Sequence, residues 1–168
     1  MHVVNVTSLS APLQQGLAAL LMDSVMHGAS IGFLWPLTQA DAEAYWGSVG
    51  QALDKDQLLW VIEEQGEYLG TVQLARCQKQ NGRHRAEVQK LMVHSQARGR
   101  GLASRLMQQL EVHALTVGIS LLVLDTLAGS DAEQFYQQRG WHRAGQIPDY
   151  AAAPDGALHP TVYFYKHI

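Results

Sequence analysis

Two arginines and two glycines alternate at residues 98–101, within the stretch SQARGRGLASRLMQQL that covers residues 95–110. Leucines then recur every four residues from Leu102, which predicts that a helix begins directly after Gly101. The first turn of a helix has N–H groups without partners and a partial positive charge, and glycine lets an anion come close to the backbone. Arg98 and Arg100 would add positive charge. This pattern predicts a phosphate site, in particular for a diphosphate, although an ordinary glycine turn before a helix can look the same.

The surrounding residues exclude two other kinds of phosphate loop. The Gly-Lys-Ser/Thr ending of a Walker A loop does not occur in the chain. A dinucleotide-binding fingerprint needs Gly or Ala at position 104, where Ser104 stands, and it normally follows the first strand of the fold. A dinucleotide-dependent oxidoreductase is therefore disfavoured.

Two carboxylates could do acid–base chemistry. Glu87 lies in the predicted strand RAEVQKLMV, where it shares one face with Gln89 and Leu91. Asp125 ends the apolar strand LLVLDT, where an ionised side chain is costly without a role or a partner. Two simpler explanations stay open: Glu87 could be a surface carboxylate paired with Arg85, and Asp125 could cap the following loop.

The elements that would position these residues can be predicted from periodicity and helix-capping signals. Helices are predicted from Ser10 to Gly28, after the capping pair Thr38–Asp41, after Gly101, and after the capping pair Ser130–Glu133. Strands are predicted at residues 2–9, 57–65, 66–78, 85–93, 120–126, 141–150 and 161–168. This order predicts an α/β protein with a mixed sheet and helices on both faces, in which an antiparallel half meets a parallel crossover at residues 95–110.

The length, composition and net charge of the chain narrow the classes of protein to which it can belong. A length of 168 residues with 47% apolar residues fits one domain over residues 1–168. A net charge of -3 argues against a general nucleic-acid binder. Cys77 is the single cysteine, which fits a cytoplasmic protein, and we find no signal peptide or membrane span. The eight histidines lack helical metal-ligand spacing, so no metal is expected.

The spacing Gln96-x-x-Gly99-x-Gly101 resembles the acetyl-coenzyme A signature Q/R-x-x-G-x-G/A of the GCN5-related N-acetyltransferases (GNAT). The segment AEQFYQQRGW resembles the second motif of that superfamily, and the element order matches as well. The resemblance implies the GNAT fold: a central mixed sheet of six to seven strands in the order β-α-α-β-β-β-α-β-α-β-β. The segments NGRHRAEVQKLMV, ARGRGL and PDGALHPT are similar to the tabtoxin-resistance type of acetyltransferase.

The resemblance also implies where acetyl-coenzyme A would bind. Main-chain groups of the strand around Met92 would pair with the pantetheine arm, and an N–H group there could polarise the thioester carbonyl. Backbone amides of the glycine loop would hold the diphosphate. One position departs from the family pattern: Gly129 stands where many relatives have Asn, and Ser130 could substitute although it also resembles a helix cap. The implied cofactor residues are Leu91, Met92, Val93, Arg98, Gly99, Arg100, Gly101, Leu102, Ala103, Ser104, Ser130 and Tyr136.

The resemblance implies a catalytic set of Tyr136, Glu87 and Asp125. Tyr136 matches the tyrosine that protonates the leaving thiolate in many relatives, although it could also be a buried ring beside Phe135. Of the two carboxylates, one could take a proton from the amine while the other binds it.

The resemblance implies that the acceptor pocket is shaped by GASIGFLWPL and DYAAAPDGALHPT. Within these segments, Trp35 and Tyr150 are the candidate substrate-binding residues, together with the two carboxylates. The residues at positions 33–35 could instead fill the core beneath two helices.

We therefore predict an N-acetyltransferase that moves an acetyl group from acetyl-coenzyme A to a primary amine of a small molecule, such as an amino-acid-like toxin or antibiotic. Direct attack in a ternary complex is expected, by a monomer or homodimer without nucleic-acid or membrane partners. Two alternatives stay open: a non-catalytic sensor of acetyl-coenzyme A, and an acetyltransferase of protein N-termini or lysines.

Overall fold

The computed structural model describes residues 2–168, so Met1 of the predicted domain lies outside the described residues. Seven strands form one sheet in the order β1-β2-β3-β4-β5-β7-β6. Neighbouring strands run antiparallel except β4 and β5, which are parallel. This arrangement confirms the predicted mixed sheet and its parallel crossover. The strands are β1 (His2–Val6), β2 (Gln57–Glu64), β3 (Glu67–Arg76), β4 (Arg85–Val93), β5 (Leu121–Leu127), β6 (His142–Ala152) and β7 (Leu158–His167).

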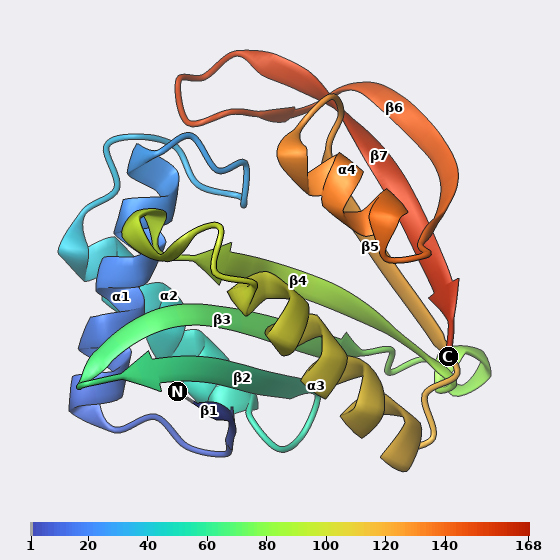
Figure 1. Cartoon of the computed structure of the whole chain (residues 1–168), viewed down its shortest axis with the longest axis horizontal. Coiled ribbons are helices and arrows are strands. Elements are labelled where there is room, and N and C mark those ends of the chain that lie inside the picture. The colour runs from blue at the N-terminus through green and yellow to red at the C-terminus, as the bar shows by residue number, and fades with distance from the viewer. Residues whose placement is uncertain (1) are drawn as a thin grey trace.

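Four α-helices cover the two faces of the sheet. They are α1 (Ala11–Met26), α2 (Gln39–Ala52), α3 (Leu102–Thr116) and α4 (Asp131–Gln138). In Figure 1, α1 and α2 lie behind the sheet, while α3 and α4 lie in front of it. Each side has its own core: Trp46 and Leu17 are fully buried behind the sheet, and Leu106 and Phe164 are buried in front. Within residues 2–168, no helix has the length and apolar character needed to cross a bilayer.

Three of the helices begin at the capping residues that the sequence predicts. The Ser10 hydroxyl accepts from the Leu13 N–H at 3.4 Å, and the Thr38 hydroxyl accepts from the Asp41 N–H at 3.1 Å. Ser130 caps α4 in the same way. Each such cap stabilises its helix by about 1 kcal/mol relative to alanine, which explains why polar residues define these boundaries.

The feature of the fold that matters most for function is the separation of β4 from β5. The two strands pair only through Arg85–Glu87 of β4 and Leu121–Val123 of β5, and then diverge (Figure 1). On its other side β4 carries a bulge against β3, where Lys90 has a φ of +50°. Bulges bend a strand and increase its twist, so this one helps to turn β4 away from β5. One edge of β4 beyond Glu87 is left without a neighbouring strand among the described residues.

Candidate functional site

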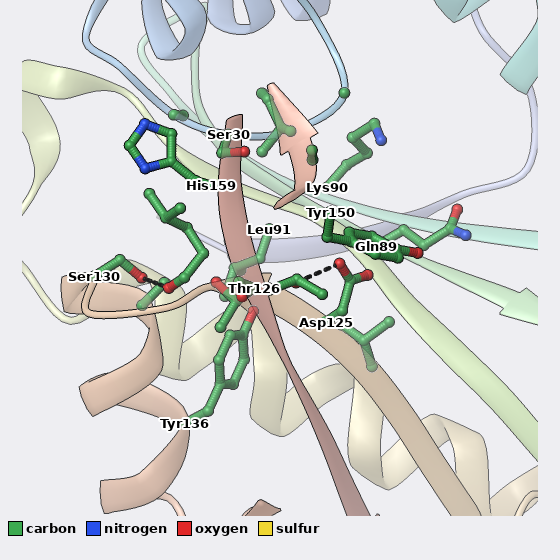
Figure 2. Close-up of a pocket in the computed structure, with 18 of the residues that line it drawn as sticks. Ser30, Gln89, Lys90, Leu91, Asp125, Thr126, Ser130, Tyr136, Tyr150 and His159 are labelled. Carbon is green, nitrogen blue, oxygen red and sulfur yellow. Dashed lines mark hydrogen bonds between the residues drawn. The ribbon is translucent and has the colours of Figure 1, made fainter. Parts of the chain in front are cut away.

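A cavity of about 390 Å³ lies where β4 and β5 separate. Four parts of the chain line it: β4, the segment from the end of β5 into α4, the loop between α1 and α2, and the hairpin of β6 and β7. Figure 2 shows these side chains converging from elements that are far apart in the sequence. Among the lining residues that could do chemistry are Glu87, Lys90, Asp125, Tyr136, Tyr150 and Thr161.

Both predicted carboxylates line this cavity, and strand alternation explains why. On β4 the neighbours of Glu87 are buried in the core with α3, so Glu87 itself projects from the opposite face of the sheet. Asp125 projects from that same face of β5, because the preceding Leu124 belongs to the core. The Asp125 carboxylate is held by the Thr161 hydroxyl, which lies 2.8 Å from its Oδ2. The structure thus brings two carboxylates from adjacent strands to one opening.

Tyr136 reaches the same cavity from α4 (Figure 2). Its side chain is only 6% exposed and makes edge-on ring contacts with Phe135 and Trp141. Burial, together with the negative charge of Asp125, raises the pKa of the Tyr136 phenol well above its usual value. The phenol therefore stays protonated at neutral pH and can act as a hydrogen-bond or proton donor. The two interpretations of Tyr136, buried ring and site residue, are compatible in this geometry.

The charged groups that line the cavity influence one another. The charge of Asp125 adds to the effect of burial in raising the pKa of Tyr136. Burial lowers the pKa of Lys90, while Glu87 and, to a smaller extent, Asp125 oppose that shift. The cavity therefore combines a phenol, two carboxylates and an ammonium, and in Figure 2 Lys90 and Tyr136 reach it from different sides.

Lys90 is a cavity residue that sequence reasoning missed. Regular alternation along β4 would place Lys90 on the same face as Ala86 and Val88, toward the core. The bulge changes this phase, and Lys90 instead reaches the α1–α2 loop and α2. Its Nζ lies 5.9 Å from the ring centre of Phe33 and 5.8 Å from that of Tyr45. In the sequence, the sign of this role was a lysine directly before the apolar residues 91–93 of the strand.

The acceptor-side loops meet at the cavity, and of their two predicted residues Tyr150 lines it while Trp35 does not. The Tyr150 hydroxyl lies 2.6 Å from that of Tyr163, which stands outside the lining. That hydrogen bond, more than burial or nearby carboxylates, raises the pKa of Tyr163. Trp35 is not among the lining residues, and its side chain is 48% exposed. Its backbone N–H instead donates to the Pro154 carbonyl at 2.9 Å, which ties the two loops together.

The structure agrees only in part with the alternative prediction that residues 33–35 fill the core beneath two helices. Phe33 packs against the core behind the sheet, whereas Leu34 is 54% exposed. The loop therefore lines the cavity through residues 28–32, while the side chains of Leu34 and Trp35 face outward.

The predicted diphosphate loop lies at the start of α3. Gly99 and Gly101 have φ values of +75° and +74°, which favour glycine. A Cβ built on either residue would meet no protein atom within 4 Å. Gly101 is the N-cap of α3 and supplies no side chain, so the first N–H groups of this helix are open to an anion. Because the Leu102 side chain is buried, only its backbone can take part.

The charged residues of this loop differ in their surroundings. Arg98 is exposed beside the glycines. Arg100 donates to Glu64 Oε2 at 2.8 Å, and this hydrogen bond lowers the pKa of Glu64. Both side chains are largely solvated, so the pair is weak and Arg100 can exchange it for a phosphate oxygen. Ala103 and Ser104 are half-buried in the first turn of α3.

Of the remaining implied cofactor residues, Leu91 and Ser130 line the cavity, and Met92 and Val93 continue β4 toward the loop. Leu91, Met92 and Val93 form the end of β4 whose edge toward β5 has no partner strand, so their backbone groups could pair with an extended ligand arm. Ser130 lines the cavity while its hydroxyl caps α4 and lies 2.6 Å from the Leu127 carbonyl, so it serves as cap and wall together. Within residues 2–168, no three His, Cys, Asp or Glu side chains gather as a metal site would require.

A half-buried carboxylate anchors the diphosphate loop to α1. Both oxygens of Asp23 accept from Ser95, one from its N–H and one from its hydroxyl, each at 2.8 Å. The imidazoles of His94 and His27 lie nearby. Burial alone would raise the pKa of Asp23, but the Ser95 hydrogen bonds and the histidines outweigh it, so the pKa is lowered. The ionised carboxylate therefore holds the loop where it leaves β4.

We expect Asp23→Asn to lower the free energy of unfolding by about 1–2 kcal/mol at pH 7, because hydrogen bonds to a charged acceptor are lost. Since the folded-state pKa is lowered, this stabilisation is complete above the unfolded-state pKa of about 4 and disappears as the pH falls through the folded-state pKa. Urea unfolding of both proteins between pH 7 and pH 2.5 measures the difference. The exposed Asp56→Asn is the control, and a difference that persists at the lowest pH would contradict the assignment.

Comparisons with known proteins identify the family and agree with the fold. A sequence profile of the acetyltransferase (GNAT) family matches residues 22–141. An N-acetyltransferase from Staphylococcus aureus superposes with a TM-score of 0.79 at 19% identity, covering 99% of both chains. A ribosomal-protein-alanine N-acetyltransferase from Brucella melitensis gives 0.79 at 20% identity, over 98% of this chain and 99% of that one. The yncA protein from Salmonella typhimurium, solved with acetyl-coenzyme A as its cofactor, gives 0.76 at 17% identity, over 98% and 93%.

Proposed function

The chain belongs to the acetyltransferase (GNAT) family, and we propose that it transfers the acetyl group of acetyl-coenzyme A to a primary amine of a small molecule. The observation that carries this proposal is the meeting of Tyr136, Asp125 and Glu87 at one cavity, in a chain that also has an open start of α3. The cavity volume of about 390 Å³ supports a small acceptor. The Trp35–Pro154 hydrogen bond, which joins the loops across the acceptor side, supports the same conclusion against a long peptide.

The cofactor-binding residues fit a coenzyme with a diphosphate and an extended arm. Open N–H groups at the start of α3 would hold the diphosphate, with Arg98 and Arg100 adding charge. The unpaired edge of β4 at residues 91–93 would hold the arm as a further strand holds its neighbour. Acetyl-coenzyme A supplies an activated acetyl group at the end of that arm. An N–H group near Met92 would then polarise the carbonyl that the amine attacks.

Two proton movements are required. An amine with an ordinary pKa of about 10 is mostly protonated at neutral pH and must lose a proton before it attacks. We assign that proton to Asp125, whose charge acts on Tyr136, either directly or through water, and Glu87 would bind the ammonium form. Tyr136, whose raised pKa keeps the phenol protonated, would stabilise the leaving thiolate by donating a hydrogen bond to it, and the thiol forms when the thiolate takes a proton from water.

Within the family, we assign the chain to the tabtoxin-resistance type, with a toxin or antibiotic amine as acceptor. Three segments support this narrower assignment: residues 81–93, which contain Glu87; residues 97–102 of the diphosphate loop; and residues 154–161, which end at the cavity. A cytoplasmic location agrees with such a role, since the toxin's targets inside a cell would be protected there.

Incubation with acetyl-coenzyme A and a panel of amines tests the proposal, with thiol release as the readout and mass spectrometry to identify the acetylated product. We expect Tyr136→Phe to lower kcat about 10- to 100-fold because the thiolate loses its donor, while the Kd for coenzyme A changes less than twofold. Tyr165→Phe is the matched control, since Tyr165 lies on β7 outside the lining of the cavity. Unchanged kcat in Tyr136→Phe would remove this residue from the mechanism.

The same assay separates the other candidate functions. Tight binding of coenzyme A without turnover of any amine would identify a sensor. Turnover of peptides, with none of small amines, would identify a protein acetyltransferase. Acetylation of several small amines with normal saturation supports the proposed function.

A further inference from the structure

Lys90 is an ammonium without a hydrogen-bonding partner at one end of the cavity. It lines the cavity and is only partly exposed, yet it forms no ion pair or hydrogen bond with any of residues 2–168. Two aromatic rings, those of Phe33 and Tyr45, lie within 6 Å of its Nζ. Such rings favour the charged form of a lysine but accept none of its N–H groups as a carboxylate would. The ammonium therefore keeps donors available for a ligand.

The backbone next to Lys90 presents further donors. The N–H groups of Ser30, Ile31 and Gly32 donate to no acceptor among the described residues, and all three residues line the cavity. Gly32 has a φ of +92°, and a Cβ there would lie 3.6 Å from the Lys90 Nζ, so bare backbone faces the ammonium. This side of the cavity has donors and a positive charge, and two carboxylates line the same cavity.

The conformation of Lys90 is unusual enough to need an explanation. Its φ of +50° is uncommon for a residue with a side chain and is imposed by the bulge in β4. Regular pairing would instead direct the side chain toward the apolar core. Backbone strain of this kind persists where the surrounding structure enforces it, and it concentrates at functional sites. Here the strain directs the one lysine of β4 toward the acceptor side of the cavity.

We infer that Lys90 and the N–H groups of residues 30–32 bind an anionic group on the acceptor, while Glu87 and Asp125 receive its amine. The substrate class is then amines that carry a carboxylate or a similar anion a few bonds away, as amino acids do. This inference rests on the proposed function for the role of the two carboxylates. Lys90 is the specificity-determining residue in this arrangement and takes no part in proton transfer.

Binding of matched pairs tests the inference independently of turnover. Calorimetry in the presence of coenzyme A compares phenylalanine with phenethylamine, tyrosine with tyramine, histidine with histamine, and lysine with cadaverine. We expect the best-bound amino acid to bind about 10- to 100-fold more tightly than its decarboxylated partner. Lys90→Met should remove most of that preference and change the affinity for the partner amine less than threefold. Lys90→Glu should reverse the preference toward cadaverine.

The control variant and the possible outcomes test the inference separately from the proposed function. Lys55→Met, which removes an exposed lysine of the turn between α2 and β2, should leave every affinity unchanged. The inference is overturned if no amino acid binds, if the decarboxylated amines bind equally well, or if Lys90→Met keeps the preference. Thiol release with amines that lack a carboxylate, and no preference for amines that carry one, would support the proposed function and reject the inference. If amino acids bind, Lys90→Met abolishes that binding and the wild-type protein releases no thiol with any amine, the inference would be supported and the proposed function rejected.

Discussion

Asp125→Asn is expected to lower kcat for acetyl transfer about 10²- to 10⁴-fold, which is the usual contribution of a positioned general base. The asparagine keeps the shape of the side chain and a hydrogen-bond acceptor for Thr161, so the fold around it should be preserved. What is lost is a group that can take the amine's proton. Steady-state kinetics with the best amine of the panel measures the effect.

The pH dependence of the variant distinguishes a base from a binding group. Without the carboxylate, the reaction depends on amine that is already deprotonated, and that fraction rises about tenfold per pH unit below the amine's pKa of about 10. The rate of Asp125→Asn should therefore rise with pH where the wild-type rate is level. Glu87→Gln should instead raise the KM for the amine about tenfold with a smaller change in kcat, because it removes a charge that binds the ammonium form.

Exposed carboxylates outside the cavity provide the controls. Glu63 lies on β2 and Asp56 lies directly before it. Glu63→Gln and Asp56→Asn should therefore leave kcat and KM unchanged. A double variant, Glu87→Gln with Asp125→Asn, that keeps kcat/KM within threefold of the wild type would remove both carboxylates from the mechanism.

Gly101→Val is expected to weaken coenzyme A binding by about 100-fold or more. A side chain at this position projects into space that holds no protein atom within 4 Å, directly at the first N–H groups of α3. It would keep the diphosphate from reaching them. The loss of two charge-assisted hydrogen bonds, each contributing about 1.5–3 kcal/mol, accounts for an effect of this size. Calorimetric titration with coenzyme A measures it.

The control for this variant lies at the other end of the same helix. Gly118 has a φ of +79° against +74° for Gly101, and a Cβ there also meets no atom within 4 Å. Gly118→Val should therefore suffer similar backbone strain and a similar fall in the unfolding midpoint. Only Gly101→Val should lose coenzyme A affinity. Equal affinity in both folded variants would show that the start of α3 does not hold the diphosphate.

The element order and the helix boundaries could be predicted from the sequence because they depend on local chemistry. Ser10, Thr38 and Ser130 cap helices through hydrogen bonds to N–H groups three residues away, so the signal lies within one turn. The two-residue period of β4 likewise grouped Glu87 with Gln89, and both line the cavity, whereas the bulge turns Leu91, the third residue predicted on that face, against the core with α3. The glycines at 99 and 101 indicated an open helix start in the same way.

The cavity's acceptor side depended on contacts between segments that are far apart in the sequence. The backbone of Trp35, and not its side chain, faces the hairpin, because its N–H donates to the carbonyl of Pro154, which lies 119 residues further along the chain. The pairing of Tyr150 with Tyr163 depends on the register of β6 against β7. No local pattern contains that information.

The sequence by itself determined the order of strands and helices along the chain and the capped helix starts, because each depends on residues within a turn or a strand period. Only the tertiary structure decided that Lys90 leaves the core face and reaches the α1–α2 loop, and that β4 parts from β5 to open a cavity. The physical reason is the bulge opposite β3: one extra residue reverses the alternation of the strand, and its position is set by pairing with a neighbouring strand rather than by the residues of β4 alone.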